Sequence, residues 1–295
     1  MFSKKIYMTY KNQVPEKVFN RWQNLNPDYE IDFSLDDDCI NFLKCNFNEY
    51  IVNLFKSIKR GMFKADLWRL CKIYMNGGVY ADVDLVPYLS IDSLDKNISF
   101  YSCLNIDSDC VFQAFMINFS KPKNPLIFVF LLSFLANNPY LHANGPCHDM
   151  FNCIKYNLNN IDIIPEQKYE LDEVKIKINI GSSYTNVKNI NLFYFPEDIQ
   201  YTIKLIPNPH KDTFDFTINN NTLIVKRLDL DAGWGYPHSV DICIKSKESI
   251  LLFKENIGPN NNWVTSYVTY NSQKILDSRD LDYHNNKGWI TNTTM

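Results

Sequence analysis

Two carboxylates, Asp82 and Asp84, stand two residues apart where the short β-branched and aromatic run Val79–Asp82 gives out. On extended backbone, residues i and i+2 point to the same side of the chain. Oxygen ligands in this arrangement suit a hard divalent cation, Mg²⁺ or Mn²⁺, which commonly completes its coordination with water and substrate phosphates. The sequence therefore predicts a metal site at Asp82 and Asp84, at the end of a strand.

A helix predicted over Gly61–Asn76 brings two further charged side chains toward this point. Asp66 and Arg69, three residues apart, share one helical face. This face is separate from an apolar stripe of 3.6-residue period, which consists of Phe63, Leu67, Leu70, Cys71 and Tyr74. Gly77 ends the helix, because glycine takes the left-handed conformation without a steric clash. The four charged groups together suit a nucleoside-diphosphate sugar, with the metal neutralising the diphosphate and the other groups holding sugar hydroxyls and phosphate.

A D-x-D triplet that stands alone is more often an Asx-turn or a helix cap. Here it follows A-D-L-W-R and closes the segment Y-M-N-G-G-V-Y-A-D-V-D. This combined pattern resembles the DXD sugar-binding region of glycosyltransferase family 32, which includes yeast initiation-specific mannosyltransferases and capsular polysaccharide transferases of bacteria and viruses. The glucosylating domains of large clostridial toxins share the arrangement. The earlier segment Trp22–Glu30 is also close to the family pattern W-x-x-x-N-P-D-Y-E.

The resemblance implies a GT-A-type (Rossmann-like) α/β nucleotide-sugar domain over residues 1–160, with a mostly parallel sheet and ligands at the carboxyl ends of its strands. It implies a metal-dependent, retaining transfer of a hexose from a UDP- or GDP-sugar to a glycan or protein acceptor. Asp84 would then bind the metal directly, and Asp82 would hold ribose or sugar hydroxyls and assist it. Asp66 and Arg69 would position the donor sugar. No protein nucleophile is assigned.

Two further segments are expected to approach the donor. The predicted first strand, Lys5–Thr9, places Tyr7 and Tyr10 where the family usually has His and Trp, so Tyr7, Thr9 and Tyr10 are expected to contact the nucleotide. Stacking of Tyr10 on the base and an ordinary role as a strand aromatic are equally favoured. Asn144 and Gly145, before Pro146, loosely match a family T-G-P at a helix start, where hydroxyl or anionic groups bind readily.

Composition restricts the partners and the surroundings. A net charge of −3 over 295 residues gives no electrostatic reason to expect nucleic acid or an anionic membrane. The longest apolar run, Leu126–Ala136, is too short to span a bilayer, and the N-terminus lacks a signal-peptide core. We therefore expect a soluble cytoplasmic protein. The abundance of Asn, Ile and Lys is typical of AT-rich genomes such as those of large DNA viruses, for which the compartment would be the host cytoplasm, or low-GC bacteria.

The eight cysteines are best explained as reduced, mostly buried thiols. No C-x-x-C pair occurs, which argues against a common zinc motif. A zinc site from Cys147, His148 and Cys153 lacks the usual spacing. The cysteines therefore predict no disulfide framework.

Residues 161–295 are predicted to be β-rich, since short alternating segments such as Val174–Ile180 are separated by turns rich in Asn, Gly and Pro. This second domain would be an acceptor-side subdomain or a carbohydrate-binding module. His238 is a candidate for a further metal ligand. Two other functions stay open: a non-catalytic glycan-binding or structural protein, and a metal-dependent nucleotidyltransferase. The latter predicts a glycine-rich phosphate loop, and no such motif occurs.

Overall fold

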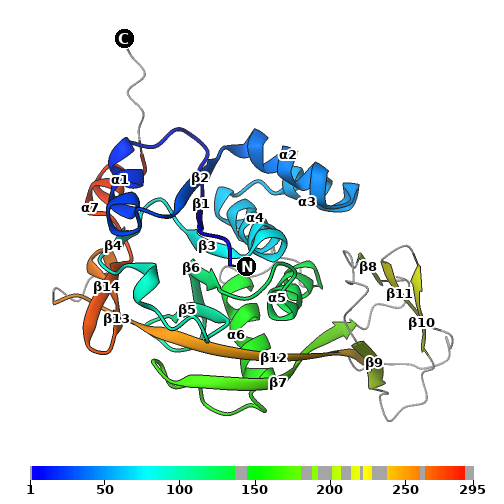
Figure 1. Cartoon of the computed structure of the whole chain (residues 1–295). Coiled ribbons are helices and arrows are strands. Elements are labelled where there is room, and N and C mark those ends of the chain that lie inside the picture. Colours follow the sequence, from blue (N-terminus) through cyan, green and yellow to red (C-terminus); the bar gives the residue numbers. More distant parts are fainter. Residues whose placement is uncertain are drawn as a thin grey trace.

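In the computed structural model, the described residues are 2–136, 145–180, 188–191, 201–206, 214–219, 222–227, 238–259 and 263–289. The first part of the chain forms β1 (Lys5–Thr9), α1 (Glu16–Leu25), β2 (Glu30–Ser34), α2 (Asp36–Asn46), α3 (Glu49–Ser57), α4 (Gly61–Asn76), β3 (Gly78–Ala81), β4 (Val86–Pro87), the 3-10 turn η1 (Ile91–Ser93), β5 (Phe100–Leu104), β6 (Val111–Asn118), α5 (Pro125–Ala136) and α6 (Gly145–Asn157). Figure 1 shows their arrangement around one central sheet.

The remainder of the chain is mostly strand, as the alternating segments predict. It forms β7 (Lys168–Ile180), β8 (Lys188–Asn191), β9 (Tyr201–Ile206), β10 (Phe214–Asn219), β11 (Thr222–Arg227), β12 (His238–Asn256), η2 (Trp263–Thr265), β13 (Tyr267–Tyr270), β14 (Gln273–Asp277) and the short helix α7 (Leu281–Asn285). Strand β12 is longer than the short segments that the sequence predicts, and its pairing with β7 has a register shift between Lys245 and Glu248. A β-bulge of this kind lets one long strand continue past a local irregularity.

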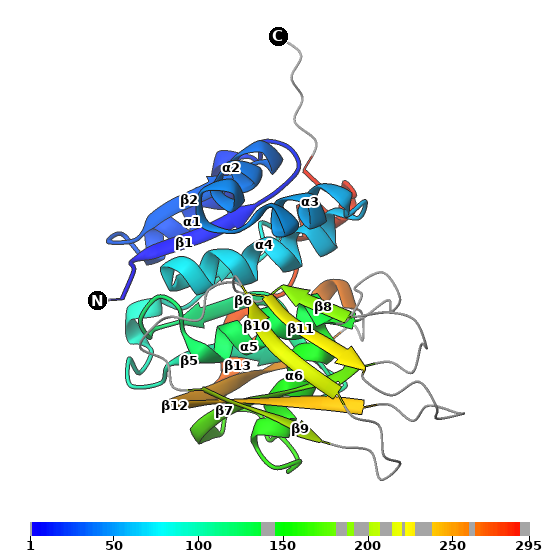
Figure 2. The same ribbon diagram turned by 90° about the vertical axis from the view of Figure 1, so that its right-hand side faces the viewer.

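The main sheet has the order β2-β1-β3-β6-β5-β12-β13-β14-β4, and β7 and β9 also pair with β12. Strand β1 runs parallel to both β2 and β3, and β12 runs parallel to β5, whereas the other pairs are antiparallel. The α/β class is confirmed, but the prediction of a mostly parallel sheet is wrong, because β6 pairs antiparallel with both its neighbours and the C-terminal strands, apart from the β12–β5 pair, are antiparallel too. A second sheet has the order β10-β11-β8 (Figure 2).

Strands from both predicted domains share the main sheet. Strand β12 of the C-terminal region pairs with β5 of the N-terminal region, and β14 pairs with β4, just after the D-x-D segment. The predicted boundary at residue 160 therefore does not separate two sheets. Figures 1 and 2 both show β7 and β12 at the opposite end of the molecule from α2 and α3.

Two hydrophobic clusters fill the two sides of the main sheet. One includes Leu43, Phe55 and Leu67 from α2, α3 and α4, together with residues of α5 and α6. The other joins α1, through Val18 and Trp22, to strands β1 and β3 and to β12. Helix α4 thus packs against the main sheet and against helices α2 and α3. This packing fixes the polar face of α4 at the carboxyl ends of β1 and β3.

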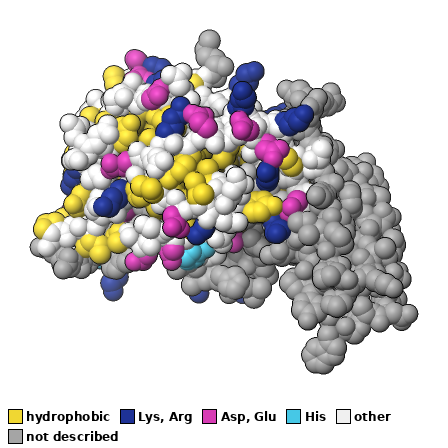
Figure 3. Space-filling model, turned by 90° about the horizontal axis from the view of Figure 1, so that it is seen from below, with side chains coloured by type: hydrophobic (Ala, Val, Ile, Leu, Met, Phe, Trp, Pro, Cys, Tyr) yellow, Lys and Arg dark blue, Asp and Glu magenta, His cyan; other side chains and the backbone are white. Residues whose placement is uncertain are grey.

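The described part of the face seen in Figure 3 mixes hydrophobic side chains with acidic and basic ones, without a large area of one charge sign.

Among the described helices, none combines the length and the apolar character that a membrane crossing requires.

Candidate active site

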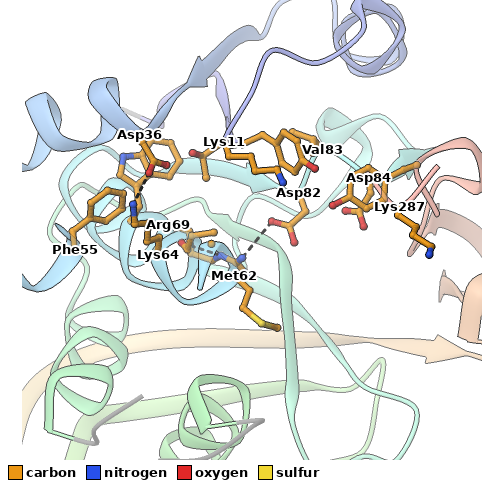
Figure 4. A pocket seen from close by; sticks show the side chains of 16 residues that line it. Lys11, Asp36, Phe55, Met62, Lys64, Arg69, Asp82, Val83, Asp84 and Lys287 are labelled. Atoms are coloured by element: carbon orange, nitrogen blue, oxygen red, sulfur yellow. Dashed lines mark hydrogen bonds and ion pairs between the residues drawn. The ribbon is translucent and has the colours of Figure 1, made fainter. Parts of the chain in front are cut away.

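A cavity of about 420 Å³ opens at the carboxyl ends of β1 and β3. The ends of these parallel strands, the first half of α4 and the C-terminal segment 281–289 supply its walls. The lining side chains include Thr9, Tyr10, Lys11, Asp36, Lys64, Trp68, Arg69, Asp82, Asp84, Tyr283 and Lys287. Figure 4 shows Asp82 and Asp84 next to each other along the pocket, with Arg69 reaching Asp82 from α4.

The turn from α4 into β3 positions the D-x-D segment, and glycine is required there. Gly77 has φ +65° and its N–H donates to the Ile73 carbonyl at 2.8 Å, which closes the helix. Gly78 has φ +89°, and a Cβ there would lie 2.9 Å from the Tyr7 ring. The predicted helix stop is confirmed, and it lets β3 enter the sheet beside β1 with Asp82 directly after its end.

Arg69 holds two carboxylates in an ion triad, in which Arg69 and Asp66 are buried and Asp82 is partly exposed. Its Nη2 lies 3.4 Å from Asp66 Oδ1 and 3.3 Å from Asp82 Oδ1, and its guanidinium stands over the Tyr80 ring at 4.6 Å. The Tyr80 hydroxyl donates to the same oxygen of Asp82. Burial raises the pKa of Asp66 to about 6, although Arg69 acts in the opposite direction. The triad therefore fixes the orientation of Asp82 at the pocket.

Asp84 differs sharply from Asp82 in its surroundings. Among the described residues, no basic side chain forms an ion pair with it, and Arg279 and Arg69 act on it only at longer range. Burial, reinforced by the charge of Asp82, raises the pKa of Asp84 to about 7. The ionised form of such a carboxylate lowers the stability of the folded protein, because no partner charge offsets the loss of its hydration.

The Asp82 and Asp84 pair has the donor chemistry that a hard divalent cation needs. Both carboxylates line one cavity, and that of Asp84 lacks a cationic partner in the described part of the chain. Mg²⁺ and Mn²⁺ prefer one or two protein carboxylates and take the remaining ligands from water and phosphate oxygens. The residues therefore fit the group that the sequence pattern predicts.

The C-terminal segment 280–289 closes one side of the pocket, and sequence analysis missed it. The Asp280 N–H donates to the Asp84 carbonyl at 2.5 Å, and Trp289 Nε1 donates to the Val83 carbonyl at 3.4 Å. Arg21 of α1 forms an ion pair with Asp280. Figure 1 accordingly shows α7 beside α1. The D-x-D backbone is thus held from both ends of the chain.

Gly288 allows this segment to approach Tyr10. Its φ is +117°, and an added Cβ would lie 2.6 Å from the Tyr10 hydroxyl. We expect Gly288→Ala to cost about 1–2 kcal/mol in the free energy of unfolding and to weaken ligand binding in the pocket by displacing Tyr10. Urea denaturation checks the first effect. Gly61→Ala, where an added Cβ meets no atom within 4 Å, should not lower stability, and equal losses in both variants would contradict the assignment.

The structure brings most of the predicted site residues together. Thr9 and Tyr10 line the cavity with Arg69, Asp82 and Asp84, and Thr9 Oγ1 also donates to the Ser34 carbonyl at 2.9 Å. Tyr7 is buried in the core, and Asp66 lies behind Arg69, so neither lines the cavity in this structure. The acidic run Asp36–Asp38 forms the first turn of α2, where negative charge favours the helix dipole.

The predicted loop before α6 is only partly described. Asn144 and the His238 side chain lie outside the described residues, whereas Gly145 is buried at the first position of α6. The neighbouring Cys147 is close enough to Asp66 and Asp82 that their charges, after burial, contribute to raising its thiol pKa to about 12. The start of α6 therefore lies near the ion triad, although it is not part of the cavity wall.

Fold and site together define an α/β protein with a carboxylate-rich pocket at the ends of parallel strands. The family model described as "Glycosyltransferase sugar-binding region containing DXD motif" matches residues 13–101. These residues run from the loop before α1 to the start of β5 and include the ion triad and both D-x-D carboxylates. The match confirms the predicted resemblance: residues 13–101 are similar to glycosyltransferase sugar-binding regions of the DXD type.

Two known proteins are similar to parts of this chain. The initiation-specific alpha-1,6-mannosyltransferase of Candida albicans (strain SC5314 / ATCC MYA-2876) is 26% identical over 106 residues, which are 32% of this chain and 28% of that protein. This chain thus matches less than a third of the length of its curated relative. The solved structure of PaToxG Glycosyltransferase aligns with 52% of this chain and 68% of that chain, with a TM-score of 0.41 and 16% sequence identity.

Proposed function

We propose that this protein is a metal-dependent glycosyltransferase that moves a hexose from a UDP- or GDP-sugar to a glycan or protein acceptor, with retention of the anomeric configuration. The observation that supports this most is the state of Asp84. It is a partly buried carboxylate in the cavity wall, without an ion-pair partner among the described residues, beside Asp82, inside a segment that matches a DXD sugar-binding family. A cation with a diphosphate would supply the missing charge.

The four charged residues of the D-x-D segment and α4 then have roles in holding the donor. Asp84 and Asp82 would hold Mn²⁺ or Mg²⁺, which supplies Lewis-acid stabilisation of the diphosphate leaving group when bound. Arg69 keeps the Asp82 carboxylate oriented through its 3.3 Å contact, and Asp66 in turn positions Arg69 beside the donor sugar.

The aromatic and basic side chains of the cavity suit the nucleotide. Tyr10 and Tyr283 meet edge to face with ring centroids 6.1 Å apart, and they offer ring surface to a base or a sugar. Lys11 and Lys287 also line the cavity, and their ammonium groups would attract phosphate oxygens. Asn144 and Gly145 would approach the sugar from the start of α6.

Binding of the donor can be tested separately from turnover. We expect UDP or GDP to bind with Mn²⁺ present and to bind at least about tenfold more weakly with EDTA, as measured by calorimetry. The Asp84→Asn variant should bind the nucleotide equally weakly with and without the metal. Metal-independent binding of both nucleotides by the unaltered protein would contradict the proposed role of the carboxylate pair.

Metal binding should depend on pH through Asp84. Because its pKa is raised to about 7, the carboxyl group is mostly protonated below that pH, and a cation must displace the proton. Mn²⁺ affinity should therefore fall by up to about tenfold for each pH unit below about 7 and level off above about 8. Calorimetric titrations across this range measure it. An affinity that stays constant between about pH 6 and pH 8 would show that Asp84 does not control binding.

A further inference from the structure

A second group of metal-binding side chains lies outside the cavity, where the turn between β5 and β6 meets the start of α6. Asp109, Cys110 and His148 each offer a ligand atom, and these atoms lie within 4.8 Å of one another. In tetrahedral zinc sites, bond lengths of about 2.0–2.3 Å place the ligand atoms about 3.3–3.8 Å apart. Small side-chain rotations would therefore be enough to close this group around an ion.

The hydrogen bond of His148 fixes a tautomer that suits a metal ligand. Nδ1 of His148 lies 2.9 Å from the backbone carbonyl of Asp109. A carbonyl oxygen can only accept, so Nδ1 carries the proton, and the neutral ring keeps a free lone pair on Nε2. Metal-binding histidines commonly fix their tautomer in this way, by donating the other N–H to a carbonyl group.

Asn105 holds the other two residues. Its side-chain oxygen accepts the backbone N–H groups of Asp109 and Cys110, each at 3.1 Å, and its amide nitrogen donates to Asp109 Oδ1 at 3.1 Å. Within the described part of the chain, no hydrogen bond or ion pair reaches the second carboxylate oxygen of Asp109. The turn therefore presents the carboxylate and the thiol from a backbone that is already fixed.

We propose that Asp109, Cys110 and His148 form a second metal site, which binds a borderline transition ion, Zn²⁺ in the first instance, with water as the fourth ligand. A thiolate and an imidazole favour zinc over the hard ions Mg²⁺ and Mn²⁺. The site is thus chemically distinct from the all-oxygen pair Asp82 and Asp84. Cys153, considered with His148 from sequence spacing, is instead buried on the core side of α6.

The ion would fasten the start of α6 to the sheet. His148 belongs to α6, and Asp109 and Cys110 lead into β6, where Gln113 Nε2 donates to the Pro146 carbonyl at 2.6 Å. Between them, Cys147 lies close to the ion triad of the cavity. The role that follows is structural: the metal would fix one flank of the donor pocket.

Co²⁺ as the probe metal tests the proposal on the full chain under reducing conditions. A cobalt–thiolate bond produces an ultraviolet charge-transfer band, whereas Co²⁺ on carboxylates alone produces none. We expect this band at one Co²⁺ per chain, its displacement by Zn²⁺ but not by Mn²⁺, and its loss in Cys110→Ser. His148→Ala should weaken Co²⁺ binding at least about tenfold, and Asn105→Ala by about 10–100-fold.

Matched controls separate this site from the other cysteines and from the cavity. Cys45→Ser removes an exposed thiol elsewhere and should leave the band unchanged, as should Asp84→Asn. Zn²⁺ should also raise the melting temperature of the unaltered protein but not that of Cys110→Ser. Absence of the band in the unaltered protein, or its persistence in Cys110→Ser, would overturn the proposal without affecting the proposed transferase function.

Discussion

The Arg69→Met variant is expected to lose about 3–5 kcal/mol of unfolding free energy at about pH 8, since removing one partner of a buried ion pair leaves an uncompensated charge. Arg69 and Asp66 are 5% and 7% exposed, and Arg69 is the only residue that forms an ion pair with Asp66 in the described part of the chain. Urea denaturation provides the measurement. Activity should fall with stability, because Asp82 loses its orienting contact.

The pH dependence of this loss identifies its cause. The pKa of Asp66 is already raised to about 6, above its unfolded value, and removing Arg69 raises it further. Protonation of a carboxyl group whose folded pKa is raised stabilises the folded protein. The loss of unfolding free energy in Arg69→Met should therefore shrink as the pH falls toward about 5. The double variant Asp66→Asn/Arg69→Met should recover part of the loss. Lys5→Met, which breaks an exposed pair with Glu30, should cost less than about 1 kcal/mol.

A deficit in Arg69→Met that is no larger than that of Lys5→Met, or that does not change with pH, would mean that the triad is not a buried ionic unit.

The Asp84→Asn variant is expected to be more stable and inactive. Ionised Asp84 is desolvated and unpaired among the described residues, so replacing it with a neutral isostere should raise the unfolding free energy without metal by roughly 2 kcal/mol at about pH 8. The folded pKa of about 7 lies above the unfolded value. The gain should therefore shrink as the pH falls through about 7 and disappear below about pH 3, where the carboxyl group is protonated in both states. Activity should fall about 10²–10³-fold, since loss of a metal ligand removes several kcal/mol of charge stabilisation.

The same substitution two residues away provides the control. Asp82 accepts hydrogen bonds from Arg69 and Tyr80, so Asp82→Asn should destabilise the protein by about 1–2 kcal/mol, while also lowering activity. Thermal and urea unfolding of both variants at two pH values would show the opposite signs. If both variants lost stability equally, Asp84 would be an ordinary structural carboxylate and the metal-site assignment would fail.

Local patterns in the sequence were sufficient to predict the helix that carries Asp66 and Arg69 and the strand that leads to Asp82. The helix over Gly61–Asn76 follows from its apolar period and its glycine stop, and the strand after it follows from β-branched residues. Together they place Arg69 and Asp82 within 3.3 Å of each other. Spacing could not show that the arginine bridges Asp66 and Asp82, because that depends on how the helix packs against the strand end.

Contacts between distant segments could not be predicted in the same way. Segment 280–289 reaches the D-x-D loop through hydrogen bonds across about two hundred residues, and neither its short helix nor its glycine has a periodic signal. Tyr7 lies within the predicted strand Lys5–Thr9, and Tyr10 follows its end. The sequence does not show that Tyr7 enters the core while Tyr10 faces the cavity, because this depends on which elements pack against each side of the sheet.

The most direct test of the account is turnover of nucleotide sugars by the purified protein with Mn²⁺. UDP- and GDP-sugars, GDP-mannose among them, would be incubated with and without glycan acceptors, and nucleoside diphosphate release would be measured. We predict release from one donor that requires the metal, is abolished by EDTA and falls at least about 100-fold in Asp84→Asn. No release from any donor, together with no metal-dependent binding of UDP or GDP, would contradict the proposed function.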